Sequence, residues 1–301
     1  MKNIFTYSTA FVLGLALVAT PDADAQQFSK RKQYNSVGFS LNAMNYFGDV
    51  VPFTNFTSLR LGATRVGAGL SITRRFYPRL SGRFGVSYGR ISGDDSKSAD
   101  PNDPDAKFRY NRNFSFRNDI LEASAVAIFD LVENRNNYLK RPDFVPYVFA
   151  GVAGFYHNPK GLVGPNTAGL TEGTYIALAD LKTEGQSTAY SQTQFAIPFG
   201  GGIRYRINRN FDASLEIGWR KTFTDYLDDV SGKYAGPAAL TGSAAQQYFG
   251  YGITKSRTGT FNNFDSAGSK RGTDNKNDWY IVTGVTLNYI LTPRIKNPKF
   301  R

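Results

Sequence analysis

The sequence predicts an all-β protein, an eight-stranded antiparallel transmembrane β-barrel with short periplasmic turns and long extracellular loops. Three observations indicate this class: a long two-faced hairpin over residues 194–223, an N-terminal segment with the features of a secretory signal, and no later apolar run long enough for a membrane helix. Inside a bilayer, only helices and closed barrels satisfy every backbone hydrogen bond. A secreted chain without a helical span can therefore cross a membrane only as a barrel.

Residues 1–25 have the composition of a signal peptide. Lys2 supplies the positive charge, Ile4–Thr20 form a largely apolar stretch, and Ala23 and Ala25 are small residues at the positions that a signal peptidase reads. The alternative is an N-terminal membrane anchor, but the stretch is shorter than the ~18 apolar residues of a membrane helix. We expect residues 26–301 to form a single barrel domain in the bacterial cell outer membrane.

The hairpin is the clearest element because alternate residues of a strand face opposite sides. Its arms flank the turn Asn208–Asn210 and each has roughly thirteen residues, more than the ~9–11 that a tilted strand needs to cross a bilayer. One face of the second arm is apolar and the other polar. The apolar face carries Phe211, Ala213, Leu215, Ile217 and Trp219, and the polar face Asp212, Ser214, Glu216, Gly218 and Arg220.

Six further segments repeat this alternation, which gives eight strands, an even number as in bacterial single-chain barrels. The fifth segment is apolar on both sides, so the sequence does not assign its inner face. The six segments are Asn35–Phe47, Arg65–Phe76, Ser81–Ile91, Phe114–Asp130, Val145–Tyr156 and Asp278–Leu291.

The predicted connections alternate between short and long. In outer-membrane barrels the short turns face the periplasm and the long loops face outward, so both ends of the barrel domain are expected in the periplasm. The short connections are Tyr77–Leu80, Leu131–Phe144 and Asn208–Asn210, and the long ones are Gly48–Thr64, Ser92–Asn113, His157–Thr193 and Thr224–Asn277.

The apolar face is expected to be the outer one. Side chains fill the interior of an eight-stranded barrel, and the numerous large apolar residues could not share it, whereas Gly, Ser and Thr could. A soluble lipocalin-like barrel is the alternative.

Charged residues on the inner face must pair because an isolated buried ion is very costly. A gated polar path is the other interpretation of these residues. The expected structural ion-pair network consists of Arg83, Glu122, Arg204, Glu216 and Arg220.

The chain is strongly basic. Its formal charge is +12, and loss of residues 1–25, which carry Lys2 against Asp22 and Asp24, leaves +13. Secretion argues against nucleic acid as the partner. The basic residues near the short turns can attract anionic headgroups or dock a periplasmic partner with an acidic patch. The docking hypothesis assigns this surface to Arg74, Arg75, Arg79, Arg209, Arg294, Lys296 and Lys299.

The residues available for chemistry favour a protein that is not an enzyme. Cysteine is absent and His157 is the single histidine, so a thiol nucleophile and a multi-histidine metal site are excluded, and a lone His near a loop is a weak candidate base. Asp225, Asp228 and Asp229 could offer oxygen ligands to Ca²⁺, although they lack the usual loop register. We expect no catalytic residue, no metal, no cofactor and no small-molecule substrate.

Several segments resemble the PorG-like outer-membrane barrels associated with the type IX secretion machinery. The resemblance implies a non-enzymatic outer-membrane component that anchors or assembles a secretion complex through periplasmic subunits. The alternative is an OmpA-like structural barrel whose long loops bind a ligand or surface. Residues 96–113, 160–193 and 233–275 match nothing in that family. The matching segments are Asn45–Asp49, Arg74–Phe76, Leu80–Gly85, Tyr88–Asp94, Ser115–Asn118, Pro146–Val152, Phe195–Gly200, Glu216–Gly232 and Asn277–Tyr280.

Overall fold

Antiparallel strands dominate the computed structural model, which describes residues 32–51, 61–100, 102–104, 106–164, 169–251, 265–273 and 276–292. The predicted signal peptide lies outside the described residues. The strands are β1 (Asn35–Phe47), β2 (Arg65–Arg75), β3 (Leu80–Asp94), β4 (Ser115–Asp130), β5 (Phe144–Leu162), β6 (Tyr175–Ala177), β7 (Thr193–Arg206), β8 (Phe211–Thr222) and β9 (Trp279–Leu291). The helical elements are η1 (Leu61–Ala63), α2 (Asp95–Ser98), α3 (Lys107–Arg112), η2 (Tyr138–Lys140), η3 (Ala179–Leu181), η4 (Pro237–Ala239) and α4 (Ala244–Gly250).

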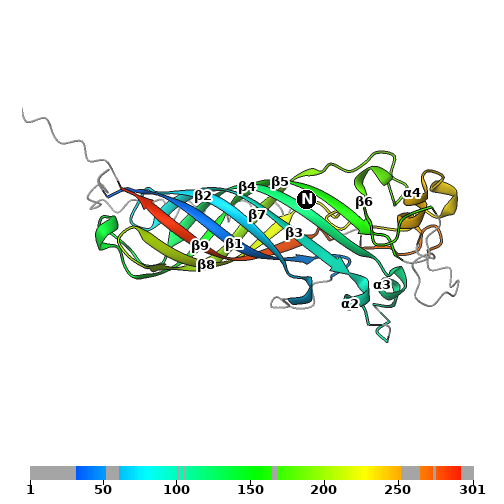
Figure 1. Ribbon diagram of the computed structural model, residues 1–301, viewed down its shortest axis with the longest axis horizontal. Helices are drawn as coiled ribbons and strands as arrows, with labels where there is room; N and C mark the ends of the chain where they lie inside the picture. The colour runs from blue at the N-terminus through cyan, green and yellow to red at the C-terminus, as the bar shows by residue number, and fades with distance from the viewer. Residues whose placement is uncertain are drawn as a thin grey trace, which may run out of the picture.

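Eight of the nine described strands close into a barrel. The order is β4-β3-β2-β1-β9-β8-β7-β5, and β4 pairs with β5 to complete the circle. Every pairing is antiparallel, and β1 and β9 lie side by side from Asn35 opposite Leu291 to Phe47 opposite Trp279 (Figure 1). The predicted fold class is thereby confirmed, and β6 is an addition that pairs only with the end of β5.

The outer face of the barrel is apolar. Alternate side chains on every barrel strand are exposed, as the volume argument predicts, so the large apolar residues form a continuous band on the outside. Exposed apolar surface of this extent marks an interaction with a partner or a membrane. The band includes Val37, Phe39, Leu41, Val66, Leu70, Ile72, Phe84, Val86, Val148, Val152, Phe195, Ile203, Leu215, Val285 and Leu287.

Strand β5 extends further than its sequence pattern indicated. It continues from Tyr156 to Leu162 because β4 pairs with it as far as Gly161 and β6 pairs with its last three residues. The structure also assigns its faces: Val145, Tyr147 and Phe149 are buried in the barrel, whereas Val148 and Val152 are exposed.

The two ends of the barrel differ. At one end, the turn end, short connections join β2 to β3, β4 to β5 and β7 to β8. At the other, the loop end, the long connections carry α2, α3, α4 and β6 (Figure 1). In outer-membrane barrels this end is extracellular. None of the helices in the described part of the chain is long and apolar enough to span a membrane.

Candidate functional site

The inner face of the barrel carries charged side chains in ion pairs at three levels. At the turn end, Asp130 is buried and accepts from two guanidinium groups, Arg75 Nη1 at 3.2 Å and Arg204 Nη1 at 3.3 Å. Arg204 was expected to belong to a network with the two glutamates; it instead pairs with Asp130. The reason is height in the barrel, since Arg204 lies opposite Ser214 in β8, whereas Glu216 is two residues closer to the loop end.

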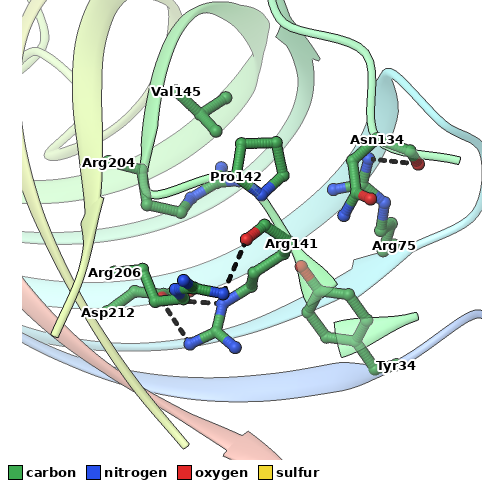
Figure 2. A pocket seen from close by; sticks show the side chains of 9 residues that line it. All are labelled: Tyr34, Arg75, Asn134, Arg141, Pro142, Val145, Arg204, Arg206 and Asp212. Carbon is green, nitrogen blue, oxygen red and sulfur yellow. Dashed lines mark hydrogen bonds and ion pairs between the residues drawn. The ribbon is translucent and has the colours of Figure 1, made fainter. Parts of the chain in front are cut away.

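Arg141 closes the mouth of the turn end. Its Nη2 lies 2.7 Å from Asp212 Oδ1, and the same guanidinium donates to the backbone carbonyls of Asn208 and Arg209 in the β7–β8 turn. Figure 2 shows Arg141 and Asp212 facing one another among the other residues at this opening. The side chain of Arg141 therefore ties the β4–β5 connection to the β7–β8 turn.

The second level is formed by Arg83 and Glu216. Their side chains make a two-point contact, of which Arg83 Nη2 to Glu216 Oε2 measures 2.9 Å, and Tyr147 Oη donates to Glu216 Oε1 at 2.6 Å. The guanidinium of Arg83 also lies 5.3 Å from the centre of the Phe149 ring. A carboxylate inside the barrel that accepts three hydrogen bonds from Arg83 and Tyr147 is well compensated.

The third level is nearer the loop end. Arg220 Nε lies 3.3 Å from Glu122 Oε2, and Tyr280 Oη donates to the same oxygen at 2.6 Å. All five residues predicted for the inner face lie there: Arg83, Glu122, Arg204, Glu216 and Arg220. Their partners Asp130, Tyr147 and Tyr280 were not predicted.

The inner side chains leave little free space. The cavities among them measure about 10 Å³ at the turn end and about 30 Å³ beside Arg83 and Glu216. A single water molecule needs roughly 10–15 Å³ by this measure. Each of these two spaces has room for no more than one or two water molecules.

The loop end is a folded cap whose buried core continues into the ends of the barrel strands. Side chains from the four long connections pack above the barrel, and the aromatic rings of Phe114, Phe116 and Phe249 contact one another there. Such a core makes the connections one packed unit. It includes Val50, Val51, Ile91, Phe114, Phe116, Leu178, Leu227, Val230, Tyr248 and Phe249.

Two buried arginines hold the cap together. The Nε of Arg112, at the end of α3, lies 2.7 Å from Asp95 Oδ2. Its Nη1 donates to the Arg271 carbonyl at 2.7 Å. Arg271 in turn contacts Glu184 Oε1 at 2.7 Å and Asp229 Oδ2 at 3.3 Å. With the bond from Arg112 Nη2 to the Asp49 carbonyl at 3.1 Å, all four long connections are linked by charge-assisted hydrogen bonds, which are stronger than neutral ones.

A group of buried carboxyls lies where the cap meets the barrel. Tyr46 Oη is 2.5 Å from Asp228 Oδ2 and 2.9 Å from Asp278 Oδ1. Burial, together with the charge of neighbouring carboxyls, raises the pKa of Asp228 and of Asp278 well above the ordinary range. Burial also raises the pKa of Asp229 to about 6.

Two of the three acidic residues considered for Ca²⁺, Asp228 and Asp229, have protein partners. Asp228 accepts from the backbone amides of Val50 and Val230, and Asp229 accepts from Thr183, Tyr190 and Arg271. Among the residues that the structure describes, no group of three or more His, Asp or Glu side chains is arranged to hold a metal ion.

His157 is fully buried on β5. Its Nδ1 lies 3.4 Å from the Asn118 side-chain amide, and its ring stacks on Tyr190. These contacts place it in the packing between barrel and cap.

The structure removes one residue, Arg75, from the predicted docking surface. Arg75 was expected on it, but its side chain points into the barrel and is only 3% exposed, because inward alternation from Thr73 directs it to Asp130. Arg74, Arg79 and Arg209 are exposed at the turn end. Arg294, Lys296 and Lys299 lie outside the described residues.

These features together define the class of the protein. A closed antiparallel barrel with an apolar outer face and a filled, ion-paired interior is an outer-membrane β-barrel protein, and its location is the bacterial outer membrane. The chain belongs to the family described as "Domain of unknown function (DUF6089)", which matches residues 24–241, more than half of its length. That description names no secretion machinery, so the PorG-like resemblance stays a prediction.

Solved structures with a similar arrangement are outer-membrane proteins of low sequence identity. OprG from Pseudomonas aeruginosa has 11% identity and a TM-score of 0.39, covering 89% of this chain and 99% of that one. Neisserial surface protein A has 13% identity and a TM-score of 0.35, covering 86% and 96%. The attachment invasion locus protein Ail of Yersinia pestis, in complex with a heparin analogue, has 8% identity and a TM-score of 0.35, covering 86% and 97%. No curated protein sequence matches the chain.

Proposed function

We propose that the protein is a non-enzymatic barrel that anchors a folded extracellular cap, and that the cap binds a ligand or another surface. The observation that carries this proposal is the contrast between a barrel filled by ion pairs and a cap packed around a buried apolar core. Because a filled barrel offers no route for a solute, we assign the function to the outer surfaces of the protein. The cap provides the largest folded surface.

The chemistry of the cap supports a binding role over catalysis. Its buried carboxyls are occupied by backbone amides, hydroxyls and Arg271, and His157 lies against Asn118 and Tyr190. A hydrolase of the Ser-His-acid type needs the imidazole within reach of a nucleophile and a reacting group. These contacts favour a packed support for an outer surface.

The test removes one segment of the cap and keeps the barrel. Residues 237–251, which contain η4 and α4, are replaced by a short Gly-Ser linker, and adhesion of whole cells to neighbouring cells and to matrix-coated surfaces is measured. Adhesion should fall although the barrel still inserts and shows heat-modifiable migration in gels. As a matched control, the turn Asn208–Asn210 is exchanged for Asn-Gly-Asn, which should leave adhesion unchanged. Equal adhesion with and without the cap segment would contradict the proposal.

A second candidate function is assembly with a periplasmic secretion subunit. It is supported by the exposed guanidinium groups of Arg74, Arg79 and Arg209 at the turn end and by the PorG-like segments. Complementary charge steers such an encounter and fixes its register. The interaction should be sensitive to salt, since exposed charges are screened over about 10 Å at 0.1 M ionic strength.

Co-purification from native membranes tests this second function. The variant Arg74→Gln/Arg79→Gln/Arg209→Gln should insert normally but lose a periplasmic protein that wild type retains at low salt. A further variant adds Arg294→Gln, Lys296→Gln and Lys299→Gln. Arg135→Gln is the control because that exposed side chain already pairs with Glu133. Identical recovery from all variants at every salt concentration would leave only attraction to lipid headgroups at this end.

A further inference from the structure

The outer face of β3, β4 and β5 changes from apolar to basic within one row of residues. Tyr88, Leu121 and Tyr156 are neighbours across the three strands, and their exposed fractions are 55%, 49% and 45%. Two residues further toward the loop end, the outward positions are Arg90, Asp119 and Asn158. Two further still, they are Ser92, Arg117 and Lys160, of which Ser92 is buried and the two cations are half-buried.

Three cations surround a single carboxylate at this place. Arg90 Nε lies 2.6 Å from Asp119 Oδ1, and Lys160 Nζ lies 4.0 Å from Asp119 Oδ2. The guanidinium of Arg117 stacks 3.8 Å from the centre of the Tyr175 ring of β6, and its Nε has no hydrogen-bond partner among the described residues. The next acidic side chain along β3, Asp94, accepts from the Ser96 amide and lies 4.0 Å from Lys97. The group of Arg90, Arg117, Lys160 and Asp119, here called the basic patch, therefore keeps two positive charges in excess.

The height of the basic patch matches the headgroups of the outer leaflet. Residues two apart in a strand are separated by about 6.8 Å, so the cations begin less than one lipid headgroup beyond the last apolar row. Tyr88 and Tyr156 mark this boundary, since tyrosine is enriched at the membrane–water interface. A phosphate at this depth could contact all three cations while its acyl chains lie along Tyr88 and Leu121.

We propose that the basic patch binds the phosphate-bearing headgroup of an outer-leaflet lipid. Guanidinium and ammonium groups are the usual phosphate ligands of proteins, and Asp119 holds Arg90 and Lys160 in place without neutralising the patch. Because the basic patch adjoins the apolar band, we infer that the phosphate belongs to a lipid. On the opposite side of the barrel, Lys221 is an outward cation of β8 near the rim, 5.6 Å from the Trp279 ring. The inference does not depend on what the cap binds.

The test measures lipid binding to the purified full-length protein in detergent by native mass spectrometry. The probes are diphosphorylated lipid A and the same lipid with both phosphates removed. Wild type should bind the phosphorylated form preferentially. Arg90→Gln/Arg117→Gln/Lys160→Gln should bind it about a hundredfold more weakly, since each basic residue near a charged lipid contributes about a fivefold effect. Asp119→Asn should bind it more tightly, because the competing carboxylate is gone.

Two controls keep the proposal falsifiable. Lys221→Gln removes one outward cation on the other side of the barrel and should change binding less than twofold. Folding of each variant is followed by heat-modifiable gel migration, and if the triple variant does not fold, Lys160→Gln alone should still weaken binding about fivefold. Equal binding of both lipid forms by wild type, wild-type affinity in the triple or the Lys160→Gln variant, or an equal loss with Lys221→Gln would overturn the assignment.

Discussion

At the scale of single residues, glycines on β7 and β8 make room for aromatic rings from β5, which lies beside β7 in the barrel. A Cβ added to Gly218 would lie 2.8 Å from Phe149 Cζ, and one added to Gly202 would lie 2.8 Å from Tyr147 Cζ. These glycines thus allow two rings on β5 to reach Arg83 and Glu216. The sequence predicted an inner face of small and polar side chains. The structure shows that aromatic rings also lie there, each beside a glycine.

The Arg83–Glu216 pair gives a prediction about the interior. Glu216→Leu should destabilise the barrel by about 3–5 kcal/mol, because it leaves the Arg83 charge buried and without its carboxylate. The double variant Arg83→Met/Glu216→Leu should recover most of this loss, since removing both partners avoids the uncompensated charge. Urea titrations of the protein folded in lipid vesicles measure both values. Equal losses in the single and double variants would show that packing, not charge, sets the cost.

Leu215 gives a prediction about the outer face. Leu215→Arg should cost roughly 2–4 kcal/mol if this side chain faces the middle of the bilayer, whereas a charge near the interface costs about 0–1 kcal/mol. Phe223→Arg is the matched control: Phe223 has the same exposed fraction, 54%, but follows the end of β8. Refolding into vesicles gives both numbers, and indistinguishable costs would contradict the inside–outside assignment.

At the scale of elements, the stability of the cap depends on the protonation of buried carboxyls. Asp228 and Asp278 share Tyr46 Oη, and the pKa of each is raised by burial. The folded state therefore holds protons more tightly than the unfolded state does. Stability contributed by these groups falls as the pH rises, which is opposite to the usual effect of a salt-bridged aspartate.

The cap should consequently lose stability as the pH rises from about 4 through about 6, the window given by the raised pKa of Asp229, and beyond it because of Asp228 and Asp278. Asp228→Asn removes the charge and keeps one acceptor oxygen, for the amide of either Val50 or Val230, so it should flatten this dependence. Thermal unfolding followed by near-ultraviolet circular dichroism is the measurement. The exposed Asp100→Asn is the control, and a slope as steep in Asp228→Asn as in wild type would count against the cluster.

At the scale of the whole molecule, the barrel separates two surfaces of different character. The turn end closes on Arg141 and Asp212 and presents Arg74, Arg79 and Arg209, whereas the loop end carries the cap. An epitope inserted between Ala99 and Asp100 should be labelled on intact cells, and one inserted after Asn208 only after the outer membrane is permeabilised. Immunofluorescence on intact and permeabilised cells distinguishes them, and the reverse pattern would invert the topology.

The sequence by itself determined the eight barrel strands, their alternation and the lengths of their connections, because a strand that faces lipid on one side must repeat apolar residues with a period of two. It also placed Arg83, Glu122, Arg204, Glu216 and Arg220 on the inner face. The tertiary structure decided which of them pair, as Arg204 does with Asp130, because stagger between strands sets the height of each side chain. Arg75 lies inside the barrel because the alternation of β2 continues past Thr73. It also decided the extension of β5 past Pro159 and the packing of the cap. Those contacts join residues far apart in sequence, such as Tyr46 with Asp228, and no local period records them.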